Sequence, residues 1–290
     1  MNRRTAPLLA AISILTCGCI VPEDASPAVS LGSALATKFV HRGMTQSENG
    51  VLRPRLAMTL PTVTEDSVRL VVEGNMDLSN DNGDAWFPRG HGGKFSEVDF
   101  IGSYTQRFED ASLFGILELG QPTVTAGVFN YNLPNGAEFQ ADTLSGVAGG
   151  GPFDERGATS EVFVQVSAEV LEANPYLSWH YDFDEVNGAY YRAGIVETFE
   201  INDDWGVLLD GSLGYASAAQ SDWLYDLAQS GLADLRGKAE IFWFYDDRTR
   251  IAGAVHGSMM IDNDIEEWFV DVGIPDSDPI WFSLGVTWAF

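Results

Sequence analysis

Hydrophobic and polar side chains alternate over most of the chain, in segments of about ten residues. The clearest segment ends the chain, where every second residue from Ile280 to Phe290 is apolar and most residues between them are small or polar. A period of two predicts β-strands, and about ten residues is the length that a tilted strand needs to cross a bilayer. The pattern predicts strands near residues 31–42, 51–61, 66–78, 94–108, 111–131, 159–171, 174–184, 187–200, 204–216, 233–245, 248–261 and 279–290.

The two faces of these segments differ in charge, and the difference predicts their orientation. In the segment 66–78, Val68, Leu70 and Val72 share one face, whereas Arg69 and Glu73 share the other. A charged side chain that faces lipid near the bilayer centre costs roughly 2–4 kcal/mol, and the same side chain costs little in a watery lumen. We therefore expect the apolar faces to contact lipid, in an all-β fold that forms a single transmembrane antiparallel up-and-down barrel.

The connecting segments favour about twelve strands. Short connectors alternate with longer ones, the short ones near 61–65, 109–110, 172–174, 202–203 and 246–247 and the longer ones near 79–93, 132–158, 217–232 and 262–278. An even number of strands places both termini in the periplasm. Gln121-Pro122 interrupts the segment 111–131, and Pro54 predicts a bend or an end within 51–61, so the pattern also accommodates ten to fourteen strands.

The last strand predicts a location and a partner. Leu284, Val286, Trp288 and Phe290 form a series of alternating apolar residues that ends in a terminal aromatic residue. This series resembles the C-terminal signature of barrels in the bacterial outer membrane. It implies contact with outer-membrane lipid, and recognition by the barrel-assembly machinery through the C-terminal strand. The oligomeric state stays open.

The N-terminus has the pattern of a secretory signal peptide. Arg3 and Arg4 precede an apolar stretch at 6–15, and small residues follow it. We expect residues 1–19 to be the signal peptide, 20–30 a short periplasmic leader and 31–290 the barrel. Gly18-Cys19 fits the site at which a lipoprotein signal is cleaved before an acylated cysteine, although the two residues before it fit poorly. Lipidation of Cys19 and ordinary cleavage before Pro27 both stay open.

The strongly acidic composition excludes one class of partner. The formal net charge is −26, and it becomes −28 when the two arginines of the signal peptide are removed. Such a surface repels nucleic acid, so no nucleic-acid partner is predicted. Asp262, Asp264, Glu266 and Glu267 lack the spacing of a calcium loop, and we predict no metal site and no cofactor.

Charged residues of both signs share the face that the pattern directs inward. The candidate pore-lining residues are Arg42, Arg53, Arg55, Arg69, Glu73, Asp99, Glu118, Glu161, His180, Asp182, Arg192, Asp210 and Glu240. Opposed basic and acidic walls would create a constriction field in a pore, which predicts a porin-like channel for passive diffusion of small solutes or ions. The alternative is a structural or scaffold barrel whose lumen is plugged by a network of ion pairs, because a barrel of twelve strands lies between the filled and the open sizes.

A barrel hydrolase is a weaker interpretation. His180 and Asp182 lie on the same face of one predicted strand, where a carboxylate could orient a general base. No nucleophile can be recognised beside them, so no catalytic residue is assigned and the chain is not expected to be an enzyme.

One motif resembles a known group of proteins. The residues from Ala36 to Gln46 read ATKFVHRGMTQ, and Arg42-Gly43 followed by Thr45-Gln46 is similar to the end of the first strand in the TorF-like family of bacterial outer-membrane porins. Segments at 160–164, 175–184 and 211–215 also look similar. Phe39 replaces the usual tyrosine of the motif. The resemblance implies a barrel that forms a pore, and it supplies no substrate and no catalytic residue.

Overall fold

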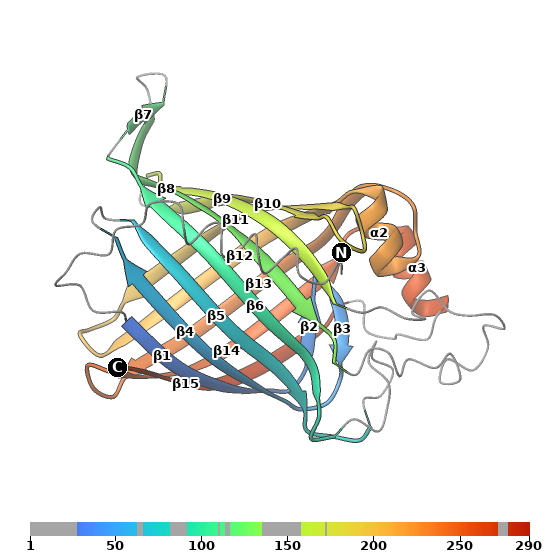
Figure 1. Cartoon of the computed structure of the whole chain (residues 1–290), viewed down its shortest axis with the longest axis horizontal. Helices are drawn as coiled ribbons and strands as arrows, with labels where there is room; N and C mark the ends of the chain where they lie inside the picture. Colours follow the sequence, from blue (N-terminus) through green and yellow to red (C-terminus); the bar gives the residue numbers. More distant parts are fainter. Residues whose placement is uncertain are drawn as a thin grey trace, which may run out of the picture.

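The computed structural model describes residues 28–62, 66–81, 92–109, 111–113, 117–134, 158–171, 173–271 and 278–290. Twelve strands of this described part close into one antiparallel barrel (Figure 1). They are β1 (Ala28–Ala36), β4 (Val51–Pro61), β5 (Ser67–Asp77), β6 (Phe95–Arg107), β8 (Leu117–Asn132), β9 (Thr159–Glu169), β10 (Asn174–Asp182), β11 (Ala189–Glu200), β12 (Trp205–Ala216), β13 (Gly231–Phe244), β14 (Thr249–Met260) and β15 (Ile280–Ala289). In the described residues, no helix has the length and hydropathy needed to cross a membrane.

Each barrel strand pairs with its neighbours in the sequence, and the first and last strands close the barrel. β1 pairs with β15 from Ser30↔Ala289 to Ala36↔Ser283. The backbone N–H of Phe290 donates to the carbonyl of Val29 at 2.8 Å, so the start of β1 and the end of the chain lie at the same end of the barrel. We call this the terminal end, and the opposite end the loop end. The fold class and the strand number predicted from alternation are confirmed.

The outer surface is apolar, as the alternation predicts. Leu284 is 60% exposed, Val286 46%, Trp288 50% and Phe290 62%, and each faces away from the barrel interior. Exposed leucine, isoleucine, valine and phenylalanine side chains continue this surface around the other strands. A folded protein rarely leaves so many large apolar side chains in water, and a belt of this kind is the surface that a barrel presents to lipid.

The structure corrects two of the predicted strands. The first strand runs over Ala28–Ala36 instead of 31–42, so it begins inside the predicted leader, and a separate small hairpin follows it. The segment 111–131 is divided into β7 (Ala111–Leu113) and β8. Gln121-Pro122 does not divide the segment but lies within β8, where Gln121 has φ 40° and the register with β9 shifts between Gly120 and Thr123.

Pro54 does not end its strand. It lies inside β4, and the pairing of β4 with β5 is interrupted there, between Leu52↔Met76 and Arg55↔Glu73. Proline has no N–H to donate to a neighbouring strand, so the gap in the ladder falls where the donor is missing.

Extra elements gather at the loop end. The hairpin of β2 (Phe39–His41) and β3 (Met44–Ser47) follows β1, α2 (Ala218–Tyr225) connects β12 to β13, and α3 (Asn263–Asp271) connects β14 to β15 (Figure 1). Ser217 caps α2, because its side chain accepts a hydrogen bond from the N–H of Gln220. The terminal end has short turns, such as the one between β13 and β14.

Candidate functional site

The residues of the TorF-like motif form a tight turn. His41 and Met44 pair across the β2–β3 hairpin, with Arg42 and Gly43 between them. Both central residues have positive φ, 48° for Arg42 and 84° for Gly43. Two consecutive residues with positive φ characterise a type I′ turn, in which glycine is favoured at the second position. The Arg42-Gly43 pair therefore sets the shape of the hairpin tip.

The hairpin lies inside the barrel, because its side chains contact the wall on several sides. Arg42 Nη2 lies 2.7 Å from Glu161 Oε1 of β9. The ring of His41 packs edge-on against Tyr131 of β8, with centroids 5.5 Å apart. Ser47 Oγ donates to Asp77 of β5 at 2.6 Å. We call residues 37–50 the lumenal hairpin.

A Cβ placed on Gly43 shows how closely the tip approaches the far wall. Such an atom would lie 2.3 Å from Met260 Sδ of β14 and 3.1 Å from Asp234 Cβ of β13. Real Cβ atoms essentially never approach another atom as closely as 2.3 Å. Only glycine fits at this point of the tip, since the position also demands positive φ.

Arg42 is the centre of a buried polar network. Its side chain is 5% exposed, and that of its partner Glu161 is 3% exposed. Its guanidinium lies over the ring of Tyr190, 4.5 Å from the centroid. Tyr190 in turn donates to Asp234 at 2.6 Å, and Asp234 also pairs with Arg236 at 2.5 Å. The network therefore joins the hairpin to β9, β11 and β13.

The two loop helices pack with the hairpin at the loop end of the lumen. The hydroxyl of Tyr225 in α2 donates to the backbone carbonyl of Arg42 at 2.7 Å. Burial raises the pKa of this hydroxyl well above its usual range, so it stays protonated and remains a donor. Tyr225 also packs edge-on against Phe269 of α3, with ring centroids 6.0 Å apart.

The loop end of the lumen contains an apolar cluster, which is unusual for the interior of a barrel. Its buried members from the hairpin, both helices and the wall include Phe39, Met44, Tyr190, Leu224, Tyr225, Met260, Ile265 and Phe269. A cavity of about 20 Å³ lies beside Arg42 and Glu161. That volume accommodates about one water molecule. The hairpin and the helices therefore fill this end of the lumen tightly.

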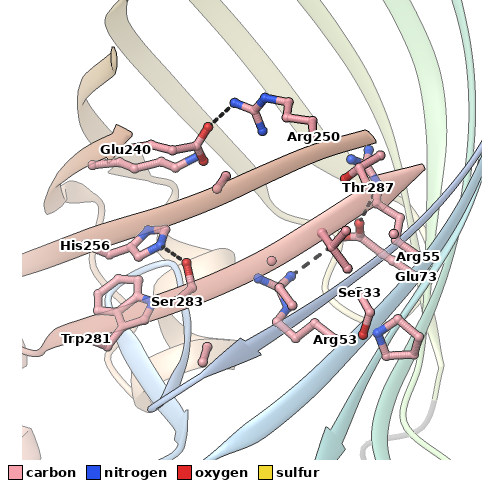
Figure 2. A pocket seen from close by; sticks show the side chains of 18 residues that line it. Ser33, Arg53, Arg55, Glu73, Glu240, Arg250, His256, Trp281, Ser283 and Thr287 are labelled. Atoms are coloured by element: carbon pink, nitrogen blue, oxygen red, sulfur yellow. Dashed lines mark hydrogen bonds and ion pairs between the residues drawn. The ribbon is translucent and has the colours of Figure 1, made fainter. Parts of the chain in front are cut away.

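A larger cavity of about 270 Å³ lies along the wall strands and reaches toward the terminal end, where Arg250 and Thr287 line it (Figure 2). It is bounded by β1, β4, β5, β13, β14 and β15. Small residues of β1 and β15, such as Gly32, Ala34 and Gly285, make room for it. The six strands are adjacent in the sheet, so the cavity follows one side of the barrel wall.

Two charged clusters border this cavity, and in each cluster two cations share one carboxylate. On β4 and β5, Arg55 Nε lies 3.3 Å from Glu73, and Arg53 lies 4.0 Å from the same carboxylate. On β13 and β14, Lys238 Nζ lies 2.7 Å from Glu240, and Arg250 also binds that carboxylate. The predicted separation into a basic wall and an acidic wall is not what these clusters show, because each cluster contains both signs.

Neutral polar groups and aromatic rings complete the lining. His256 Nε2 lies 2.9 Å from Ser283 Oγ, and the imidazole stacks on Trp281 with centroids 5.0 Å apart and planes 7° apart (Figure 2). The hydroxyl of Thr287 also lines the cavity. These groups lie between the two charged clusters along the sheet.

The structure divides the candidate pore-lining residues into two groups and a remainder. Arg53, Arg55, Glu73 and Glu240 meet at the cavity, whereas Arg42, Glu161, His180 and Arg192 meet at the hairpin. The others are Arg69, which pairs with Thr59 across β4 and β5, Asp99, which is buried opposite Glu73, Asp210, which accepts from Tyr176, Asp182, which holds a turn, and Glu118. Glu118 pairs with β7 beyond the register shift of β8, and its side chain lies outside the described residues.

The contacts of the suggested hydrolytic pair are different from those of a base and its orienting carboxylate. His180 Nδ1 lies 3.4 Å from Glu161, which is already paired with Arg42. Asp182 accepts from Thr159 Oγ1 at 2.5 Å and from the backbone N–H groups of Asp184 and Val186 at 3.0 Å. Its carboxylate therefore holds the β10–β11 turn and does not orient His180.

Several residues of these sites were not selected from the sequence. Arg250 shares the inward face of β14 with His256, so strict alternation along that strand was the signal that could identify it. Tyr190 and Asp234 lie near the loop-end termini of their strands, where the sequence gives no indication that a hairpin will be buried against them.

The fold resembles solved outer-membrane channels at low sequence identity. An outer-membrane channel from Pseudomonas putida F1 has a TM-score of 0.51 and 8% identity, with 93% of this chain and 100% of that chain covered. The NanC porin has a TM-score of 0.47 and 11% identity, and the KdgM porin has a TM-score of 0.45 and 9% identity. Each of these two comparisons covers 91% of this chain and 99% of the other chain. No family model and no curated protein matches. The chain has the fold of outer-membrane β-barrels, and its resemblance to the TorF-like family stays a prediction.

Proposed function

We propose that this chain is a porin-like channel of the bacterial outer membrane, which lets small solutes or ions diffuse passively and has both termini in the periplasm. The observation that carries the proposal is the charged cavity of about 270 Å³ inside a closed barrel whose outer surface is apolar. A structural barrel needs no charged cavity inside its lumen. Charged groups around a water-filled lumen are the usual means by which pores select solutes.

The lumenal hairpin would limit conductance in this channel. It lies within the lumen near the loop end, where it is held by the Arg42–Glu161 ion pair and by the apolar cluster. The same observation favours the second candidate function, a scaffold barrel with a plugged lumen. The two functions differ in one measurable property, because the intact chain conducts if it is a channel and passes no current if it is a scaffold sealed by the hairpin.

Removing the hairpin tests the proposal without disturbing the barrel pairing. Ala36 and Val51 are directly paired across β1 and β4, so residues 37–50 can be replaced by a two-residue Asn-Gly turn. We expect the refolded wild-type chain to give small single-channel conductance in planar bilayers, and the shortened chain to give conductance several times larger. An intact chain that shows the heat-modifiable gel shift of a folded barrel but passes no current, while the shortened chain conducts, would contradict the channel and favour the scaffold.

A further inference from the structure

We infer that the cavity beside β1 and β15 is a binding site for small organic dianions, with one carboxylate of the solute directed to each charged cluster. The inference deepens the proposed function, on which it rests for its role in transport, by naming the class of solute. It begins from the charge of the described lining residues, where Arg53, Arg55, Lys238 and Arg250 accompany only Glu73 and Glu240. This lining is cationic in a chain whose formal net charge is −26.

The cations of the lining keep the capacity to bind a further anion. Arg53 is 4.0 Å from Glu73, and its side chain is 42% exposed. The side chain of Arg55 is 45% exposed and shares that carboxylate. A guanidinium has five N–H donors in a planar fork that matches a carboxylate, so one shared acceptor leaves donors available to a solute.

The second cluster, on the other side of the cavity, also consists of two cations and one carboxylate. Lys238 and Arg250 are each 31% exposed, and the Glu240 between them is 10% exposed. The carboxylate is thus more covered than the two cations, which present their charge to the cavity. Two separate cationic clusters favour a solute with two acidic groups over one with a single acidic group.

Neighbouring acidic residues do not line the cavity. Asp99, the cross-strand partner of Glu73, is 5% exposed, and Glu97 on the same strand is 4% exposed. Asp210 lies opposite Lys238 on β12 and accepts a hydrogen bond from Tyr176. A solute in the cavity would therefore meet guanidinium and ammonium groups before these carboxylates.

The size and the polar lining restrict the solute further. A volume of about 270 Å³ lies just below the range of roughly 300–1,000 Å³ for pockets that hold drug-sized ligands. Ser283 and Thr287 offer hydroxyls between the clusters, and Trp281 offers a ring next to His256. We therefore expect a small, hydrogen-bonding organic acid and not an extended polymer.

Titration of the folded barrel in detergent micelles tests the inference apart from transport. We expect the intrinsic tryptophan fluorescence to respond to succinate, with an apparent Kd at least tenfold lower than for acetate, and not to respond to the uncharged succinamide. The double variant Arg53→Gln, Arg55→Gln and the variant Arg250→Gln should each weaken succinate binding roughly tenfold or more, because each removes charged donors. Glu240→Gln should strengthen it, since one competing negative charge is removed.

Arg248→Gln is the matched control. Arg248 is exposed in the β13–β14 turn, two residues from Arg250, and it does not line the cavity, so we expect unchanged binding. Loss of affinity in Arg248→Gln equal to that in Arg250→Gln would overturn the site, and so would equal binding of succinate and succinamide. Succinate binding without conductance would contradict the proposed channel function and support the binding site. Conductance with cation preference and no succinate binding would contradict the binding site and support the proposed channel function.

Discussion

The two ends of the lumen use the same kinds of ion pair in different surroundings. At the hairpin, Arg42 and Glu161 have side chains that are 5% and 3% exposed, whereas at the cavity Arg55 and Glu73 have side chains that are 45% and 23% exposed. A buried pair that loses one partner leaves an uncompensated charge away from water, whereas an exposed pair contributes little to stability. The first pair therefore holds structure, and the second remains available for a solute.

The largest expected effect comes from breaking the buried pair. Arg42→Met should lower the free energy of unfolding by about 3–5 kcal/mol, because the carboxylate of Glu161 stays buried without its cation. Arg55→Met at the cavity should change it by less than about 1 kcal/mol. Urea titration of both variants folded in lipid vesicles measures the difference. Equal losses in the two variants would remove the distinction between the ends.

The next effect concerns the tip of the hairpin. Gly43→Ala should destabilise the folded state by about 2 kcal/mol or more, because alanine at positive φ costs roughly 1–2 kcal/mol and its Cβ would meet Met260. Gly237→Ala on β13 is the control, since a Cβ there has nothing within 4 Å. The same urea titration, with single-channel recording of both variants, provides the measurement. A Gly43→Ala barrel as stable as the control would show that the tip is not held against the wall.

The smallest expected effect tests whether α2 retains the hairpin. Tyr225→Phe removes only the hydroxyl that donates to the carbonyl of Arg42, and it should cost about 1 kcal/mol. Tyr245→Phe, at a side chain that is 65% exposed in the β13–β14 turn, should be neutral. We expect hydrogen exchange of the hairpin amides to rise in the first variant and to stay constant in the second. Unchanged exchange in Tyr225→Phe would mean that α2 does not retain the hairpin.

The alternation of apolar and polar residues predicted the strands of the barrel wall, but it did not predict the hairpin that lies inside the lumen. The inward position of Glu73 and the outward position of Leu284 both follow from the period of two, which is a local property of each strand. Arg42 was expected on the inward side of a first strand that reached residue 42, whereas β1 ends at Ala36 and Arg42 lies at the tip of the lumenal hairpin. Its partner Glu161 lies 119 residues away, and no short-range pattern specifies such a contact.

The cavity shows the same division between local and long-range information. Arg53, Arg55, Glu73 and Glu240 were predicted to face inward, and they do so because their strands are regular around them. Their arrangement in two clusters, each with two cations around one carboxylate, depends on the register between strands. Register is fixed by pairing across the sheet, so it cannot be counted from one strand alone.

The sequence positions of the hairpin's anchors have a consequence for biogenesis. The hairpin follows the first strand and is synthesised early, but Tyr225 lies 183 residues beyond Arg42, and Met260 comes from the penultimate strand. Contacts between residues so far apart in the chain form late, because a long loop must close before they can be made. The lumenal hairpin therefore lacks these contacts during most of assembly, and it can adopt its final position only when nearly all strands of the wall have paired.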